Sequence, residues 1–357
     1  MRCTNRRTSA AAAYYALTTL VSSTATTAAA SFTTLPVRRQ LSERRSYGNT
    51  LEVPVSLLTT THSLPKGRKR PSSVALFSSS SSLGKEAGAS VVDSMVIHSI
   101  VETESTQDEA RRLIMDELSS AHDNFAVLAT EQTRGRGTCG RSWIGRKGNV
   151  FLTVGIKSEE VPIHPITLVP LKMGVLVARA IHDRIQNSGN SSSGKGTCAV
   201  TVKWPNDVLV DGKKVAGILI ENFIHDNQVW FLVGIGINVA EAPAIDSQGP
   251  EGGRPSACIL DYCGSSATIN ATEECNALAT QIANSVHTWV QNSTGQYETS
   301  RDVVKEWEEW AELGKELFLR DDASREPVIP LGIEPDGRLR VRDRNGRERF
   351  LVADYLY

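Results

Sequence analysis

The sequence predicts an α+β fold: a mixed, mainly antiparallel sheet with helices, plus a small C-terminal β-barrel. Two observations carry this prediction. Between Val96 and Ile237, short apolar segments of strand composition alternate with longer segments in which apolar residues recur at helical spacing. From Glu316 to Tyr357, short strands alternate with the turn pairs Asp336-Gly337 and Asn345-Gly346. A segment this short seldom folds alone, so we expect it to dock on the main domain.

The bulk composition excludes several classes of protein. The chain has 357 residues and a formal net charge of -1, whereas a general nucleic-acid binder normally shows a basic footprint. It has no apolar run long enough to cross a membrane. The six cysteines form no C-x-x-C pair, so we expect reduced thiols in a non-oxidising compartment. We therefore expect neither a nucleic-acid nor a membrane partner.

Residues 1–94 form a separate, low-complexity segment. They are rich in Ser, Thr, Ala and Arg, and from Met1 to Gly88 the acidic residues are Glu43, Glu52 and Glu86 alone. Such a composition buries too little apolar surface to offset chain entropy, so we expect disorder. Few acids with many arginines is typical of an organelle transit peptide. We expect targeting to a plastid rather than to a mitochondrion. Two alternatives remain open: a low-complexity tail on a cytoplasmic protein, and a true start of the protein at Met95.

The first half of the main domain, assigned to residues 95–313, opens with a strand and a helix. Val96 to Val101 has strand composition. Thr106 at the N-cap, with Glu109 three residues later, predicts a capping box that opens the helix. Further strands are expected over Phe125–Ala129 and Asn149–Ile156, and an apolar helix over Leu168–Ile185.

The second half begins with a strand at Val200–Val202, which leads into Lys203. The pair Asp211-Gly212 predicts a tight turn, after which the strands Val215–Glu221 and Val229–Ile237 complete an antiparallel meander. Helices are expected over Thr272–Trp289 and Asp302–Leu313. The remaining residues, 314–357, form the predicted barrel.

A loop rich in glycine and arginine, Gln132 to Trp143, is the first candidate ligand site. Its glycines let the backbone approach a ligand and point amides at it, and its arginines suit carboxylate or phosphate. The spacing fits neither G-x-G-x-x-G nor G-x-x-x-x-G-K-[ST], so it supports neither a Rossmann nor a P-loop nucleotide site. An exposed basic turn remains the alternative. The residues concerned are Arg134, Gly135, Arg136, Gly137, Gly140 and Arg141.

Two further segments could contact a ligand. Lys203 precedes Trp204-Pro205, and because proline cannot donate to a sheet ladder, the strand should stop there and leave Lys203 at the sheet's edge or mouth. A solvated lysine at an ordinary turn is the alternative. In Gly234-Ile235-Gly236-Ile237-Asn238, two glycines on a strand indicate a bulge or the close approach of something flat.

The order and spacing of these segments resemble the biotin protein ligase family over residues Val96 to Tyr357. The segments, in order, are Ser105-Thr106-Gln107, the Gly/Arg loop, Lys203-Trp204-Pro205-Asn206-Asp207, Ala216-Gly217-Ile218-Leu219 and Gly236-Ile237-Asn238. The resemblance implies a class II synthetase-like biotin/lipoate ligase fold. No helix-turn-helix domain is apparent in the N-terminal segment, so the chain is similar to the ligase-only type.

The resemblance implies a two-step reaction. Biotin and MgATP give biotinoyl-5'-AMP, and biotin then passes to a lysine of a carboxyl carrier domain, with no bound prosthetic group and a homodimer left open. The implied catalytic residues are Lys203, Arg136 and Arg141. The implied biotin-binding residues are Ser105, Thr106, Gln107, Gln132, Gly135, Arg136, Gly137, Thr138, Lys203 and Gly217, and the implied nucleotide-binding residues are Arg141, Trp143, Asn206 and Asn238. No metal-binding residue is predicted.

The loop departs from the family pattern at Thr138, where well-known bacterial relatives have an arginine that helps to retain the adenylate. We expect a looser grip there, or a replacement by Arg134. The neighbouring Cys139 is also unusual, and we interpret it as a small loop residue. Two other functions remain open: a lipoate or octanoate ligase of the same fold, and a biotin or nucleotide sensor without activity.

Overall fold

The computed structural model describes residues 94–116, 124–188, 198–245, 254–263, 270–292, 297–318 and 326–352. The interpretation of residues 1–94 as a disordered presequence therefore concerns a segment that lies, apart from its last residue, outside the described residues. Most of the Ser/Gly-rich loop after Asn187 is likewise outside them. In the described part, no helix is long and apolar enough to cross a membrane.

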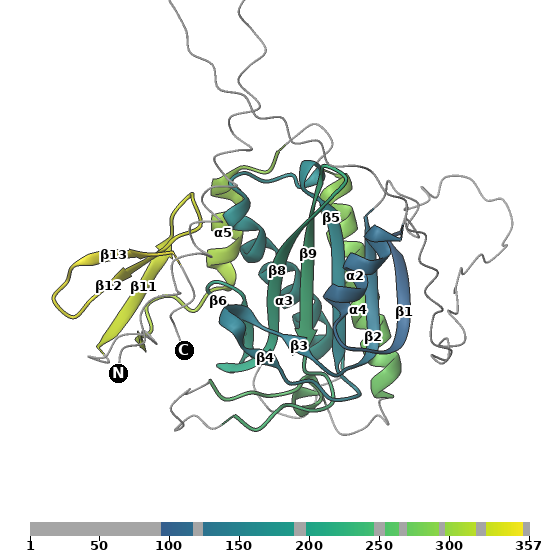
Figure 1. Ribbon diagram of the computed structural model, residues 1–357. Coiled ribbons are helices and arrows are strands. Elements are labelled where there is room, and N and C mark those ends of the chain that lie inside the picture. Colours follow the sequence, from purple (N-terminus) through teal and green to yellow (C-terminus); the bar gives the residue numbers. More distant parts are fainter. Residues whose placement is uncertain are drawn as a thin grey trace, which may run out of the picture. The chain divides into compact units, whose positions relative to one another are not determined.

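The main domain is built on a seven-stranded sheet with the order β1-β2-β5-β9-β8-β7-β6 (Figure 1). The β1–β2 pair is parallel and every other neighbouring pair is antiparallel, so the mixed, mainly antiparallel sheet is confirmed. The strands are β1 (Val96–Thr103), β2 (Phe125–Gln132), β5 (Val150–Lys157), β6 (Val200–Lys203), β7 (Asp207–Val210), β8 (Lys213–His225) and β9 (Gln228–Ile237).

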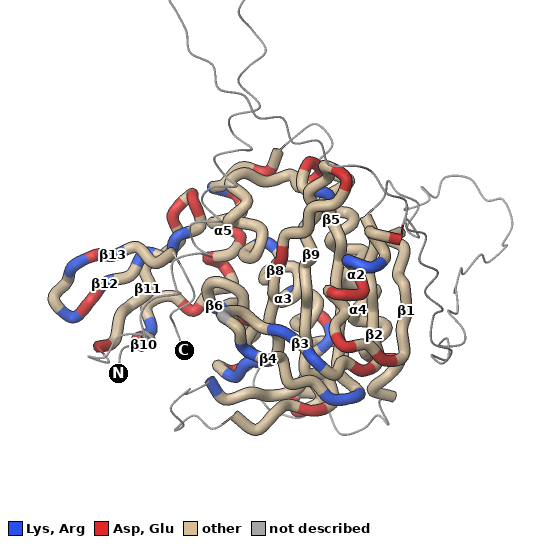
Figure 2. The backbone as a smooth tube through the Cα atoms, in the orientation of Figure 1, with Lys and Arg blue, Asp and Glu red and all other residues tan. Residues whose placement is uncertain are grey.

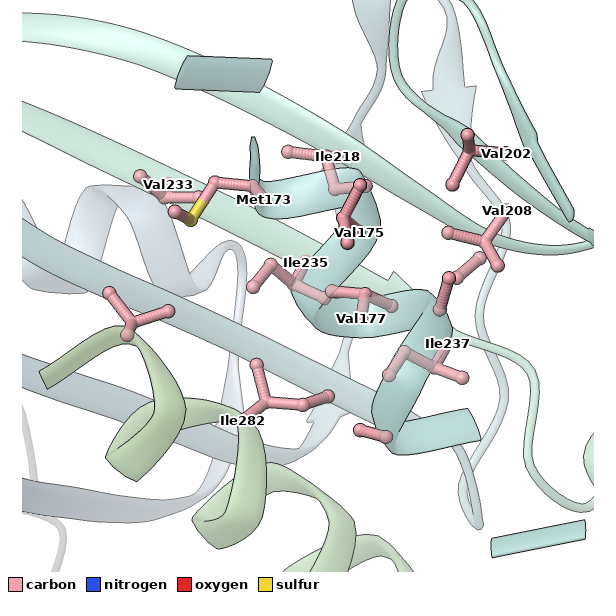
Figure 3. Close-up of a cluster of buried hydrophobic side chains, with 14 of the residues drawn as sticks. Met173, Val175, Val177, Val202, Val208, Ile218, Val233, Ile235, Ile237 and Ile282 are labelled. Carbon is pink, nitrogen blue, oxygen red and sulfur yellow. The ribbon is translucent and has the colours of Figure 1, made fainter. Parts of the chain in front are cut away.

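Helices cover both faces of this sheet. The long helices α3 (Val169–Asn187) and α4 (Ala271–Gln291) pack on one face, where they form the larger apolar core with α5 (Ser300–Trp310). Figure 3 shows part of that core, in which Met173 and Val177 of α3 and Ile282 of α4 meet Val233 and Ile235 of β9. The shorter helix α2 (Thr106–Met115) covers the opposite face with a second, smaller cluster. Short 3-10 segments lie at η2 (Ser158–Glu160), η3 (Ile166–Leu168) and η5 (Ile259–Tyr262).

The alternation of side chains along β9 determines where the sheet is covered and where it is open. Successive strand residues point to opposite faces, so Phe231, Val233 and Ile235 enter the larger core while Trp230 and Leu232 pack under α2. The next two residues on the α2 face are Gly234 and Gly236. Because these glycines have no side chains, the sheet surface beyond the helix stays open to other groups.

The C-terminal residues form a separate antiparallel sheet, as expected for the small β domain. Its strands are β10 (Leu317–Phe318), β11 (Pro327–Ile333), β12 (Leu339–Arg342) and β13 (Glu348–Leu351), paired in that order. Its outer strands, β10 and β13, are not paired with each other in the described ranges. Gly337 and Gly346 have φ values of 86° and 77° at the two predicted turns. The buried indole Nε1 of Trp204 donates to the Gly337 carbonyl at 3.0 Å and so links the two sheets.

Element boundaries agree with the sequence within a few residues, with one wrong local prediction. The capping box at Thr106 is absent: the N-cap is Ser105, and no side chain caps the helix there. Thr106 is the first helical residue, its backbone amide donates to Oε1 of Gln132 at 2.9 Å, and Glu109 pairs with Arg112 instead. A tertiary contact thus satisfies the amide that the local motif would have satisfied. The side chains of Cys198, Cys258, Cys263 and Cys275 are free thiols, as expected.

Candidate active site

A cavity of about 640 Å³ opens on the α2 face of the sheet, at the glycines of β9. Its walls are the start of α2, the Gly/Arg loop and the ends of β6 to β9. Ligand cavities of proteins commonly have volumes between about 300 and 1,000 Å³, so this one is large enough for a small molecule and part of a nucleotide.

One row of residues across the sheet forms the base of the cavity. Strand register places Lys203 beside Asp207, Asp207 beside Gly217, Gly217 beside Gly236, and Gly236 beside Phe151. Residues paired across neighbouring strands share a face of the sheet, so all five belong to the side that carries the cavity. Lys203 stands on β6, which is the edge strand, and this confirms its expected position at the edge of the sheet.

Two lysines flank one carboxylate at the charged end of the cavity. The Nζ of Lys214 lies 2.6 Å from Oδ1 of Asp207, and the Nζ of Lys203 lies 3.9 Å from Oδ2. The Lys203 side chain is 7% exposed and that of Lys214 is 27% exposed. Burial alone would raise the pKa of the Asp207 carboxyl, but the two ammonium groups outweigh it and hold that pKa below its ordinary value. The cluster therefore carries a net positive charge.

Uncharged hydrogen-bonding groups gather at the other end of the cavity, where α2 begins. The hydroxyl of Thr106 donates to Oε1 of Gln132 at 3.2 Å and accepts from the hydroxyl of Thr153 at 2.8 Å. The amide of Gln107 donates to the Leu219 carbonyl at 3.0 Å. A Cβ atom at Gly234 would lie 2.4 Å from Nε2 of Gln107, so this glycine is needed for the close approach of that amide.

The Gly/Arg loop folds as a short hairpin above the cavity, and we call residues 133–143 the lid. Strand β3 (Gly135–Arg136) pairs with β4 (Ser142–Trp143), and the 3-10 turn η1 (Thr138–Gly140) joins them. The indole of Trp143 lies against Gly236 and Gly217: a Cβ atom at these glycines would lie 2.4 Å and 3.0 Å from the ring. The Nζ of Lys214 lies 5.5 Å from the centre of the same ring.

Five buried polar atoms in the cavity wall have no hydrogen-bond partner within the described part of the chain. They are Oε1 of Gln107, Nε1 of Trp143, Oδ1 of Asn206, Oδ1 of Asn238 and Nε of Arg254. Buried polar groups are nearly always hydrogen-bonded, and leaving one unpaired costs about 1–3 kcal/mol. Their gathering in one cavity indicates a ligand with several polar groups.

Comparison with known proteins agrees with this site. The family model described as "Biotin/lipoate A/B protein ligase family" matches residues 101–238, which contain α2, the lid and the whole row across the sheet. The biotin--[acetyl-CoA-carboxylase] ligase of Paracoccus denitrificans is 29% identical over 264 residues, covering 72% of this chain and 99% of that protein. Residues 101–238 belong to the biotin/lipoate protein ligase family.

Two other proteins similar to this chain show how far the likeness extends. The bifunctional ligase/repressor of Bacillus subtilis is 31% identical over 150 residues, and the alignment covers 42% of this chain but only 41% of that protein. The biotin protein ligase of Aquifex aeolicus, solved in complex with biotin and ATP, superposes with a TM-score of 0.52 at 21% identity. That superposition covers 73% of this chain and 97% of the other, and it supports the same fold.

Almost all the predicted site residues lie together around this cavity. The residues that line the cavity are Ser105, Thr106, Gln107, Gln132, Arg136, Gly137, Thr138, Arg141, Trp143, Lys203, Asn206, Gly217 and Asn238. Gly135 lines a second cavity on the outer side of the lid instead, of about 690 Å³. It is needed there for packing, since a Cβ atom would lie 2.5 Å from Gln132 and 2.6 Å from the Trp143 carbonyl.

The lid arginines are held by protein groups. Arg141 donates from Nε to the Thr138 carbonyl at 2.9 Å and from Nη2 to the Thr138 hydroxyl, so Thr138 fixes the orientation of this arginine. Arg134 pairs with Glu104 at 3.1 Å in an exposed position and does not line the main cavity, so it does not take the place of an arginine at 138. Arg136 pairs with two carboxylates outside the cavity.

Lys214 is a site residue that the sequence pattern did not reveal. It stands seven residues after Asp207, beside the exposed Lys213, and a strand shift between Val208 and Leu209 brings it opposite Leu209. Its position at the start of a meander strand looks like that of an ordinary solvated lysine. The pairing with Asp207 and the contact with Trp143 show otherwise, and neither could be read from spacing alone.

Proposed function

We propose that this protein is a biotin protein ligase that activates biotin with MgATP and transfers it to a lysine of a carrier domain. The observation that carries the proposal is the division of one cavity into two ends. Hydroxyl and amide groups at Thr106, Gln107 and Gln132 suit an uncharged polar ring, and the ammonium groups of Lys203 and Lys214 suit a carboxylate that meets a phosphate.

In the first step, a carboxylate oxygen of biotin bonds to the α-phosphorus of ATP while the bond from that phosphorus to the pyrophosphate oxygen breaks. Two anions must approach each other, so positive charge at the point of contact lowers the barrier. The cluster of Lys203, Asp207 and Lys214 supplies it. Lys214 is the more exposed of the two lysines, and its Nζ faces Trp143, so we assign it the direct contact and assign Lys203 a supporting charge.

In the second step, the amine of the carrier lysine bonds to the acyl carbon, AMP leaves, and the nitrogen gives up a proton. The protein needs no covalent nucleophile for this chemistry, because the mixed anhydride is already activated. It must hold the anhydride and exclude water until the carrier arrives, and the lid above the cavity suits that task.

The metal enters with the nucleotide. Among the described residues no group of three or more His, Cys, Asp and Glu side chains is placed to hold a metal ion. Mg²⁺ is usually held by substrate phosphates and water with one or two carboxylates, so the substrate is MgATP.

Transfer to a carrier domain tests the proposal as a whole. The full chain is incubated with MgATP, a biotin carboxyl carrier domain, and either biotin or lipoate, and the carrier is analysed by intact-mass and peptide mass spectrometry. We expect a single biotinyl adduct on one lysine and no lipoyl adduct. A lipoyl adduct would assign the chain to a lipoate ligase, and no adduct with either acid would favour a sensor.

We also propose that residues 1–94 direct the protein to an organelle, the plastid rather than the mitochondrion. The support is compositional: arginines are frequent and acids are rare in this segment. A fusion of these residues to a fluorescent protein should accumulate in the plastid. Uniform cytoplasmic fluorescence would show that the segment is only a tail.

A further inference from the structure

Four charged side chains form a closed ring on the outer side of the lid. Arg136 contacts Asp108 at 2.7 Å and Glu221 at 3.1 Å, and Arg111 contacts the same two carboxylates at 2.7 Å and 2.6 Å. We call these four residues the ion ring. Each arginine bridges both acids, so each charge in the ring has two partners of opposite sign.

The ring joins three elements that are distant in the sequence. Asp108 and Arg111 stand one turn apart on α2, Glu221 stands on β8, and Arg136 is the lid's contribution from β3. The tube in Figure 2 shows acidic and basic segments beside one another where β3 meets α2. Glu221 shares the face of β8 that carries Gly217, so the ring lies on the cavity side of the sheet.

The ring determines what Arg136 can do. Its guanidinium uses Nε, Nη1 and Nη2 for the two carboxylates. The hydrogen bond to Asp108 raises the pKa of Arg136 further above its ordinary value, and the same bond lowers the pKa of Asp108. Because these donors are engaged and the charge is balanced, Arg136 is arranged as an anchor for the lid.

We propose that Asp108, Arg111 and Glu221 are positioning residues that hold the lid closed through Arg136, and so set how long the activated acyl-adenylate stays in the cavity. The proposal rests on the proposed function for the identity of the intermediate. The ring ties the lid to α2 and β8 whatever the chemical identity of that intermediate.

The lid has other contacts with the body besides the ring. Its first residues are held by backbone hydrogen bonds from Thr133 to the Thr103 carbonyl at 3.0 Å and from Arg134 to the Glu104 carbonyl at 2.8 Å. At the far end, Trp143 rests on the glycines of β8 and β9. Single exposed ion pairs contribute at most about 1 kcal/mol, but a network with shared partners is the case in which such pairs matter. Near the start of the lid Arg134 pairs with Glu104, and the ring adds an ionic network that ties Arg136 to α2 and β8.

Helix α2 offers a matched control. Arg112 follows Arg111 and also makes ion pairs, but its partners are Glu109 of the same helix and Asp116 at the C-cap of that helix. Arg112→Met thus removes an arginine and its pairs from α2 without touching the lid. Arg111→Met on α2 and Glu221→Gln on β8 each remove one charge from the ion ring and leave the lid residues unchanged.

Two measurements on the full chain test the proposal. Hydrogen–deuterium exchange of residues 133–143, without ligand, reports lid closure. We expect the exchange of this segment to rise about fivefold in Arg111→Met and Glu221→Gln, which corresponds to the loss of about 1 kcal/mol, and to stay at the wild-type value in Arg112→Met. Labelling of a bystander protein's lysines, with biotin and MgATP but no carrier, reports escape of the adenylate, since a free amine converts it to an amide and AMP.

The second measurement should show about fivefold more bystander labelling in the two ring variants, with the KM for biotin changed less than about threefold. Lid exchange and labelling equal to those of Arg112→Met would overturn the proposal. If wild-type protein makes no adenylate, the proposed function fails, while the exchange measurement still decides whether the ring closes the lid.

Discussion

Trp143 of the lid lies directly on Gly236 of the central strand β9. A Cβ atom at Gly236 would come within 2.4 Å of Cε2 and 2.7 Å of Nε1 of the indole. Two glycines on a strand indicate the close approach of something flat, and the flat group here is a side chain of the same chain. The lid and the sheet surface under the cavity are therefore coupled through this contact.

Replacing Gly236 should affect the lid more than the fold. In Gly236→Ala the new methyl group meets an indole on a movable hairpin, so the indole shifts and the sheet stays intact. We expect faster hydrogen exchange over residues 133–143 and at least tenfold weaker ligand binding, with a melting temperature within a few degrees of the wild type. Gly174→Ala, where the methyl would make an ordinary 3.8 Å contact with Val202, is the control. Unchanged ligand affinity in Gly236→Ala would refute the coupling.

Removing the charge of Lys214 should slow adenylate formation far more than it weakens biotin binding. The charge acts where the carboxylate and the phosphate approach, and the loss of one such stabilising group typically costs about 10²–10³ in kcat. We expect that loss in Lys214→Met and a loss in the same direction in Lys203→Met, with the Kd for biotin changed less than about tenfold. Lys213→Met, which alters the exposed neighbour, should behave as the wild type. Equal losses in kcat and in affinity would contradict the assigned roles.

The contribution of the Asp207 carboxylate to folding stability should not change with pH across the neutral range. The Asp207 pKa lies below the ordinary value of 3.8, so the carboxylate's contribution to stability is complete above that value and is lost as the pH falls through the lower folded-state pKa. We expect Asp207→Asn to be less stable than the wild type by on the order of 3 kcal/mol from pH 5 to 8, because the buried ammonium of Lys203 and the partly buried ammonium of Lys214 lose their partner. In urea titrations this difference should shrink below about pH 4. A difference that grows in acid would contradict the pairing.

The hydrogen bond from Trp204 to the Gly337 carbonyl should stabilise the C-terminal sheet locally. Trp204→Phe keeps a six-membered aromatic ring and removes the pyrrole part of the indole with its donor, which leaves a buried carbonyl unpaired at a cost of about 1–3 kcal/mol. We expect faster hydrogen exchange over residues 326–352. Tyr262→Phe removes a comparable bond to the Val210 carbonyl in the main sheet and should leave the hydrogen exchange of residues 326–352 unchanged. Equal exchange in both variants would show that the bond does not hold the two sheets together.

Local patterns predicted the parts of the fold that depend on local rules. The pairs Asp211-Gly212, Asp336-Gly337 and Asn345-Gly346 have glycines with positive φ at the expected turns, because few other residues accept that conformation. The strand end at Lys203 followed from the missing donor of Pro205. The capping box was wrong because Gln132, which is 26 residues away, satisfies the amide of Thr106.

The parts that could not be predicted depend on contacts between distant residues. Trp143 and Gly236 meet only after the lid folds back over the sheet. Lys214 reaches Asp207 because the strand register shifts near Leu209. The family resemblance implied that Arg136 is a catalytic, biotin-binding residue, and only the positions of Asp108 and Glu221 reveal its two partners.

Pyrophosphate release in the absence of any carrier tests the central claim most directly. The full chain is given MgATP with biotin, with lipoate, or with neither, and the burst of pyrophosphate is measured in a single turnover. We predict a burst of about one pyrophosphate per protein with biotin alone, because the cavity forms and then holds one adenylate. A burst with lipoate but not with biotin, or no burst with either acid, would contradict the account.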